Sequence, residues 1–245
     1  MDPVLYNAMN GAHTEFKRQA IISHNMANIN SVGFKADLFH AQSQFIHSDL
    51  EASEAVVVQG ENNIDMTDGP LMTTNRDLDV AVQNKGWLAV QTDDGKEAYT
   101  RDGSLHINEN GMLMNSANHP VMGDGGPISI PPSQSVEIGL DGTISIVPLD
   151  GPPGTVAMID RLKLVKLNNE DVFKDVDGLV KLRKGGVAPT DANVSVVKGA
   201  LEGSNVNSIE QMISMISAGQ EFNAKMKVMQ SVSDNHQKLA QLLQD

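Results

Sequence analysis

Both ends of this 245-residue chain carry apolar residues at the three- and four-residue spacing of an amphipathic helix. A lone amphipathic helix is marginally stable in water, because its stability comes from packing its apolar stripe. Each end must therefore bury its stripe against the other end, against the middle of the chain or against neighbouring molecules. The N-terminal stripe contains Leu5, Ala8, Met9, Ala12, Phe16, Ile22, Met26 and Ile29, and the C-terminal stripe contains Ile209, Met212, Ile213, Ile216, Phe222, Met226, Met229, Val232, Leu239, Leu242 and Leu243.

Local signals predict where both helices begin and end. Pro3 suits the first turn of the N-terminal helix, where a missing N–H costs nothing. The apolar pattern continues to about Asn30, and the breaker 31–33 follows it. Residues 207–210 have the form of a capping box, so we expect Asn207 to be the N-cap of the second helix.

Between about residues 75 and 200, short alternating apolar runs replace the helical spacing, which indicates half-buried strands. The turn Asp141-Gly142 lies between two such runs and predicts a β-hairpin. Similar turns separate the other runs, as in an antiparallel β-domain. The stretch before these strands is harder to interpret: residues 36–48 would extend a helix, and 56–58 would form a strand.

The predicted fold class is therefore mixed α and β. The parts are an N-terminal helix (1–35), a connector (36–74), a central, mainly antiparallel β-domain (75–200) and a C-terminal helix (201–245).

The net charge of −13 belongs to the middle of the chain. Residues 1–35 hold three basic and two acidic residues, and residues 206–245 hold three basic and four acidic residues. This acidity argues against a general binder of nucleic acid or anionic membranes, since both require a basic surface. There is no apolar run long enough to span a bilayer. The N-terminus lacks the basic and apolar regions of a secretory signal peptide, so we expect none.

No recognisable catalytic motif occurs in the sequence. Nucleotide-binding, metalloprotease and serine-hydrolase patterns are missing, and without cysteine there is no disulfide or thiolate metal site. We therefore predict no cofactor, no metal and no enzyme activity. An alternative of another class is a periplasmic β-domain enzyme or peptidoglycan binder. Its candidate acids are Asp77 and Asp79, which would share one face of a strand.

Several motifs resemble those of the flagellar rod and hook proteins, in the order found in that family. Residues 24–35 (HNMANINSVGFK) are similar to the N-N-x-A-N-x-x-T-x-G-F-K pattern that follows the first helix, with His24 and Ser31 replacing Asn and Thr. Residues 201–207 (LEGSNVN) are similar to the E-x-S-N-V-N pattern before the last helix. The central runs 76–82 (RDLDVAV), 98–104 (AYTRDGS) and 108–113 (NENGML) also match.

The resemblance implies a structural subunit of the bacterial flagellar basal-body rod in the periplasm, acting by helical self- and co-assembly. The terminal helices would pair in a coiled-coil-like tube domain, with the β-domain outside. The short length and the run 86–88 (GWL) favour the proximal rod, with a distal rod protein as the alternative. Partners would be other rod proteins and copies of the chain. In transit, the flagellar type III export apparatus would carry the chain without a cleaved signal peptide.

We assign two groups of residues to assembly. The apolar group packs helices and subunits, and the alternative for it is an ordinary monomer core. It contains Leu5, Phe16, Ile22, Met26, Val206, Ile209, Ile213, Ile216, Met226, Met229, Leu239 and Leu243. In the second group, we expect Asn25, Asn28, Asn205 and Asn207 to satisfy backbone groups at helix ends, Gly33 to permit the turn after the first helix, and Phe34 to anchor the chain beyond it.

Overall fold

The computed structural model describes residues 3–48, 51–59, 63–149, 152, 155–175 and 177–242. They form two compact units, each built from separate stretches of the chain. Unit 1 comprises the described residues of Met1–Ile29, Asp37–Asn63 and Val206–Asp245, and unit 2 those of Asn30–Ala36 and Ile64–Asn205. The chain therefore enters unit 2 briefly between the first helix and residue 37.

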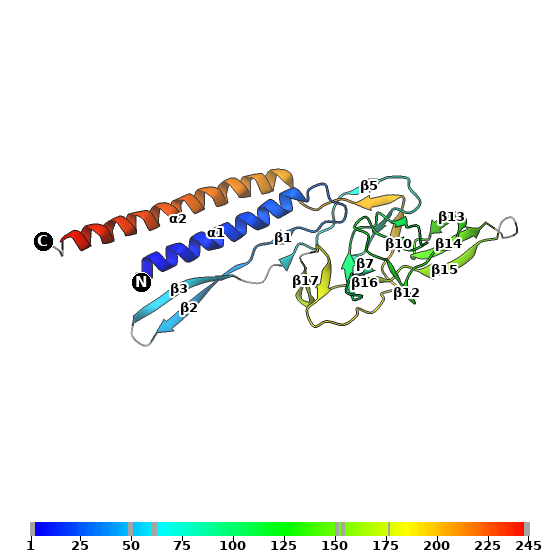
Figure 1. Ribbon diagram of the computed structural model, residues 1–245, viewed down its shortest axis with the longest axis horizontal. Helices are drawn as coiled ribbons and strands as arrows, with labels where there is room; N and C mark the ends of the chain where they lie inside the picture. The colour runs from blue at the N-terminus through cyan, green and yellow to red at the C-terminus, as the bar shows by residue number, and fades with distance from the viewer. Residues whose placement is uncertain are drawn as a thin grey trace. The chain divides into compact units, whose positions relative to one another are not determined.

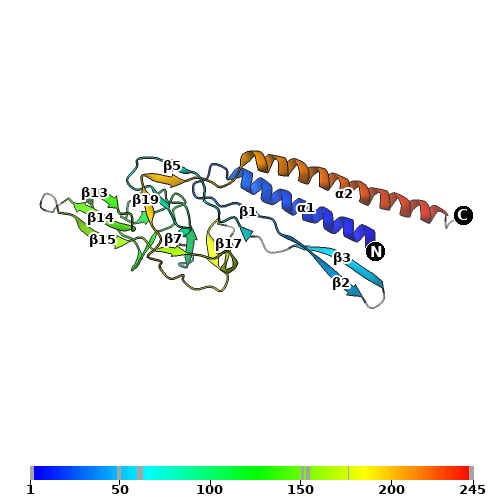
Figure 2. The ribbon, with the colours of Figure 1, turned by 180° about the vertical axis from the view of Figure 1, so that it is seen from behind.

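Two long helices, α1 (Pro3–Ala27) and α2 (Ser208–Leu242), lie side by side in unit 1 (Figure 1, and from behind in Figure 2). They run antiparallel, because α1 meets progressively earlier residues of α2 along its length. Lys225 contacts Gly11 and Glu15, whereas Glu221 contacts Arg18. The expected mixture of α and β structure is confirmed.

The bounds of both helices differ from the prediction in one respect each. α1 ends at Ala27, three residues before the expected Asn30. α2 begins at Ser208 and is capped as predicted: the side-chain oxygen of Asn207 accepts hydrogen bonds from the N–H groups of Ile209 (3.0 Å) and Glu210 (3.4 Å). Residues 201–207 are not helical, because the chain first completes a strand of unit 2 there.

Residues 41–48 form a strand, so the helix expected over 36–48 is wrong. β2 (Ala41–Ser48) pairs antiparallel with β3 (Glu51–Gln59), and the pair lies beside α1. Short apolar runs do not distinguish a strand from a helix by themselves. Here the valine-rich β3 supplies the pairing partner, as its β-branched residues favour extended structure. The strand expected over 56–58 is confirmed within β3.

Unit 2 is built from short antiparallel strands. A five-stranded sheet has the order β16-β7-β8-β18-β17, and a three-stranded sheet has the order β13-β14-β15. The predicted Asp141-Gly142 hairpin is confirmed, because β13 pairs with β14 across it. The other strand pairs of unit 2 are β9-β10, β11-β12, β6-β19 and β5-β20.

The strand bounds not yet given are β1 (Asp37–Leu38), β4 (Asn63–Ile64), β5 (Leu71–Thr73), β6 (Val80–Val82), β7 (Gly86–Gln91), β8 (Glu97–Thr100), β9 (His106–Ile107), β10 (Leu113–Met114), β11 (Met122–Gly123), β12 (Gly126–Pro127), β13 (Ser133–Ile138), β14 (Thr143–Pro148), β15 (Ala157–Arg161), β16 (Leu164–Lys166), β17 (Val172–Lys174), β18 (Val180–Leu182), β19 (Val196–Lys198) and β20 (Ala200–Glu202), with a 3-10 turn η1 at Asn169–Asp171.

The apolar core of unit 2 has two clusters. The larger joins side chains of both sheets, among them Leu88 and Ile144, with Leu113 of β10, and all three are fully buried. The second surrounds Trp87 and Tyr99 on the five-stranded sheet. The expected alternation of burial is seen in β14, whereas β6 and β7 are buried on both faces and Leu140 is 68% exposed. No helix among the described residues is sufficiently long and apolar to cross a bilayer.

Candidate assembly interface

The motif residue Glu202 lies at the centre of a buried ion cluster in unit 2. Its side chain is 2% exposed at the end of β20. One carboxylate oxygen accepts hydrogen bonds from the Lys35 ammonium (2.6 Å) and the Gly69 N–H (2.8 Å). The other oxygen accepts one from the Arg101 guanidinium (2.7 Å). Three distant motifs, around residues 35, 101 and 202, therefore meet at one carboxylate.

Both cations of this cluster have further partners. Arg101 also donates to the Val82 carbonyl (3.1 Å) and to Asp68 (3.3 Å), and its guanidinium lies 5.4 Å from the centroid of the Trp87 ring. Lys35 donates to the Thr67 carbonyl (2.6 Å). Removal from water lowers the pKa of Lys35 below its usual value, while the Glu202 hydrogen bond opposes that shift.

Gly33 and Asn205 bring the segments 30–36 and 200–205 together. Gly33 has φ +66°, and a β-carbon there would lie 2.2 Å from the Arg101 carbonyl carbon. Its N–H donates to the Glu202 carbonyl (2.7 Å). The side-chain oxygen of Asn205 accepts from the Ala36 N–H (2.8 Å), and its amide donates to the Asp65 carbonyl (3.1 Å). The helix-end role expected for Asn205 is wrong, because its side chain bonds to these neighbouring segments instead.

Phe34 lies within the same unit. Its ring centroid is 3.6 Å from the Lys174 ammonium, which also donates a hydrogen bond to the Lys35 carbonyl (2.9 Å). A cation over an aromatic face is attracted by the negative charge of the ring face. Phe34 therefore has an anchoring contact in unit 2, as its predicted role requires.

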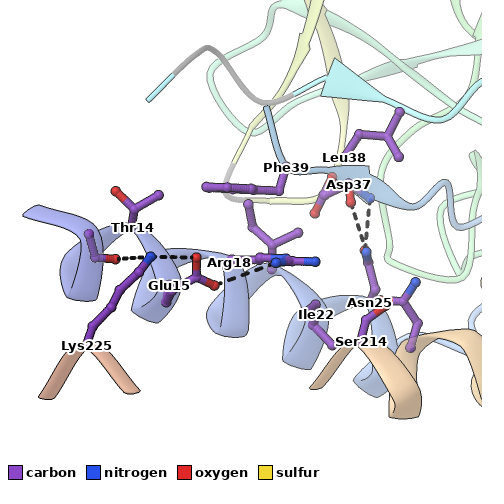
Figure 3. A pocket seen from close by; sticks show the side chains of 13 residues that line it. Thr14, Glu15, Arg18, Ile22, Asn25, Asp37, Leu38, Phe39, Ser214 and Lys225 are labelled. Carbon is purple, nitrogen blue, oxygen red and sulfur yellow. Dashed lines mark hydrogen bonds and ion pairs between the residues drawn. The ribbon is translucent and has the colours of Figure 1, made fainter. Parts of the chain in front are cut away.

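In unit 1, Asn25 binds a strand rather than a helix end, which corrects its predicted role. Its amide donates to the Asp37 carbonyl (2.9 Å), and its oxygen accepts from the Asp37 N–H (2.9 Å). Asn28 behaves as predicted, since its amide donates to the His24 carbonyl in the last turn of α1 (2.9 Å). Figure 3 shows Asn25 facing Asp37 at a groove of about 550 Å³ between α1, α2 and residues 37–39.

Most of the predicted apolar assembly residues of α2 are exposed. The α2 stripe, defined as Ile209, Met212, Ile213 and Ile216, is between 55% and 70% exposed. Its spacing places these side chains on one helix face. Ser214, Ala218 and Lys225 lie at positions on the opposite face, and Ala218 is 1% exposed. The α2 stripe is therefore not part of a core within the single chain, and the alternative of a monomer core is wrong for these residues.

The remaining apolar assembly residues differ in exposure. Phe16 and Met226 are exposed, and Met26 and Met229 are half-buried. Ile22 and Val206 are buried within the chain. Leu5 and Leu239 belong to α1 and α2, but their side chains lie outside the described part, as does the whole of Leu243.

The alternative carboxylate pair does not form. Asp77 lies in the turn before β6, and Asp79 forms an isolated β-bridge with Ser104 directly before that strand. Asp77 is exposed, whereas Asp79 is 3% exposed and forms an ion pair with Arg76 (2.8 Å). Within the described residues, no three His, Asp or Glu side chains gather as a possible metal site.

Sequence reasoning missed the ion cluster of Lys35, Arg101 and Glu202. Each residue lies inside a recognised motif, so a charged position in every motif was the available signal. No local sequence pattern indicates that these residues are partners, since 167 residues separate Lys35 from Glu202.

Three family models match the chain. "Flagella basal body rod protein" matches residues 5–35, "Flagellar hook protein FlgE/F/G D1 domain" residues 81–146, and "Flagellar basal body rod FlgEFG protein C-terminal" residues 193–242. The chain is 39% identical to the flagellar basal-body rod protein FlgF of Salmonella typhimurium, and 39% identical to FlgF of Escherichia coli, over 99% of each chain. It is 27% identical to the flagellar basal-body rod protein FlgG of Buchnera aphidicola, over 99% of this chain and 100% of the relative.

Proposed function

Since this chain belongs to the family of flagellar basal-body rod proteins, we propose that it is a structural subunit of the proximal rod, acting by helical assembly with copies of itself and with other rod proteins. The observation that carries this proposal is the exposed α2 stripe. Apolar surface gathered on one helix face is typical of an interaction site. Burying the α2 stripe against neighbouring subunits would supply the hydrophobic driving force for assembly.

In this proposal, α1 and α2 form part of a coiled-coil-like tube of many subunits, and the β unit faces outward. The near-neutral charge of both chain ends supports close packing of copies, because like charges at an interface oppose association. The exposed Phe16 and Met226 would add to the subunit contacts. The ion cluster of unit 2 would hold together the two chain segments that lead to α1 and α2.

The role is structural rather than catalytic, and it needs no cofactor. We propose that the chain reaches the periplasmic rod through the flagellar type III export apparatus, without a cleaved signal peptide. The greater identity to the FlgF relatives than to the FlgG relative supports the proximal rod over the distal rod.

Genetic replacement tests the proposal. In a bacterium that encodes this chain, deletion of its gene should abolish motility, and the full chain should restore it. Deletion of residues 1–29 removes positions of unit 1 only, so the truncated chain should keep a folded unit 2 but fail to restore motility or enter purified basal bodies. Motility restored by the truncated chain would overturn the proposal.

A further inference from the structure

Glu15 is a buried carboxylate at the contact between α1 and α2. Its residue exposure is 7%, although it lies on a helix of unit 1 rather than in the core of unit 2. One side-chain oxygen accepts a hydrogen bond from the Lys225 ammonium (3.0 Å), and the other lies 3.7 Å from Arg18. Figure 3 shows Lys225 reaching from α2 to Glu15 on α1. A buried charge costs much free energy unless it is paired, so this position of α1 requires a cation opposite.

Gly11, one helical turn before Glu15, provides the space for that cation. A β-carbon at Gly11 would lie 3.2 Å from both Cδ and Cε of Lys225, closer than ordinary contacts. The Gly11 carbonyl also accepts a hydrogen bond from the Lys225 ammonium (3.2 Å). Glycine is unfavourable within a helix, and here it leaves room for the Lys225 stem. The three residues Gly11, Glu15 and Lys225 therefore form one device, which we name the register lock.

The sequence of α2 shows what the register lock excludes. If α2 slipped along α1 by one helical turn in either direction, another residue of α2 would take the place of Lys225 opposite Glu15. The residues three or four positions away are Glu221, Phe222, Val228 and Met229. Three are apolar and would remove the cation that α2 supplies, leaving Glu15 with the more distant Arg18 of its own helix. Glu221 would instead place two carboxylates together. Each slip of one turn is therefore penalised by the same carboxylate.

We propose that the register lock fixes the antiparallel register of α1 and α2. A buried polar contact specifies register when it is satisfied at one alignment only, usually at some cost in stability. The proposal concerns helix pairing within one chain and does not depend on the proposed rod function.

Spin-label distances test this proposal in the full chain. The chain has no cysteine, so Ala20→Cys and Ser233→Cys, both at exposed positions, provide two unique label sites on α1 and α2. Double electron–electron resonance then measures the distance between them. The otherwise native chain should show one narrow distance. A slip of one turn moves the labels by about 5 Å along the helices, which is resolvable.

The decisive variant is Glu15→Gln combined with Lys225→Met, because it removes both charges and leaves neither unpaired. Its helix content by circular dichroism should stay unchanged, while further distances shifted by about 5 Å should appear. The control is Lys227→Met, which removes an exposed charge from α2 two residues beyond Lys225 and should keep one distance. Lys225→Arg should also keep one distance. The proposal is overturned if the decisive variant keeps one native distance, if it loses its helix content, or if the native chain lacks a defined distance.

Discussion

The Lys35 ammonium donates a 2.6 Å hydrogen bond to the Glu202 carboxylate, although 167 residues separate the two in sequence. Both side chains are almost fully buried, at 3% and 2% exposure. Lys35 follows α1 in the chain, and Glu202 precedes α2. The chain segments that lead to the two helices are thus bonded to each other inside unit 2.

Glu202→Gln should strongly destabilise unit 2. The substitution keeps the size of the side chain but leaves Lys35 and Arg101 without their shared anion. Breaking a buried ion pair by removing one partner costs about 3–5 kcal/mol. Urea unfolding followed by Trp87 fluorescence measures the change, since Trp87 is the one tryptophan and lies beside Arg101. The control Glu137→Gln removes the exposed ion pair with Lys198 and should leave the midpoint nearly unchanged. Equal effects of both substitutions would contradict the structural role of the cluster.

Gly33→Ala should destabilise the chain more than Gly185→Ala. Both glycines have φ +66°, so both substitutions carry the backbone strain of about 1–2 kcal/mol for an L-residue in this region. Only at Gly33 does the new β-carbon meet backbone, 2.2 Å from the Arg101 carbonyl carbon, whereas nothing lies within 4 Å at Gly185. Thermal unfolding of the two variants compares the costs. Equal losses of stability would show that the close approach of residue 33 to the Arg101 backbone adds nothing to the cost of the substitution.

Ile213→Asp should spare the folded chain and abolish assembly. The side chain is 60% exposed, so the free energy of unfolding should fall by less than about 1 kcal/mol. In the rod, however, the aspartate would be buried in the proposed subunit contact. Motility and recovery of the chain in purified basal bodies are the measurements. Ser233→Asp adds the same charge at an exposed α2 position on another face of the helix and should be tolerated. Normal swimming of the Ile213→Asp strain would argue against the α2 stripe as an interface.

Tyr99 should make the stability of unit 2 decrease at alkaline pH. Burial raises the pKa of Tyr99 above its usual value, and its hydroxyl oxygen accepts a hydrogen bond from the Ala188 N–H (2.7 Å). Above about pH 10 the unfolded chain loses this proton while the folded chain keeps it. Stability contributed by Tyr99 is therefore complete below about pH 10 and falls by roughly 1.4 kcal/mol per pH unit above it.

Urea unfolding at several alkaline pH values measures this dependence. The Tyr99→Phe variant should be less stable at neutral pH, because the Ala188 N–H loses its acceptor. Above about pH 10, however, the stability of the variant should fall less steeply with pH than that of the native chain, because unfolding releases one proton fewer. An unchanged pH dependence in Tyr99→Phe would show that another group causes the alkaline loss.

Features set by neighbouring residues could be predicted from the sequence. The cap at Asn207 needs only the two N–H groups that follow it, and the Asp141-Gly142 hairpin needs only its flanking strands. The cap and the hairpin both depend on residues that are neighbours in the sequence, so the sequence is sufficient to predict them. The alternating burial of β14 also followed from its sequence pattern, but the continuous burial of β6 and β7 did not.

Features that depend on distant partners could not be predicted. Residues 41–48 form a strand because β3 pairs with them, and the sequence of 41–48 alone does not contain that partner. The expected helix-end roles of Asn25 and Asn205 failed for the same reason: their side chains bond to strand and loop backbone from other parts of the chain. The motif pattern marked these positions correctly, but only the fold assigns their partners.

An electron cryomicroscopy map of the intact basal body tests the rod assignment most directly. The map should place this chain in the proximal rod, with α1 and α2 inside the tube and neighbouring subunits covering Ile209, Ile213 and Ile216. A map in which the chain is missing from the rod, or in which the α2 stripe faces solvent, would contradict the proposed function.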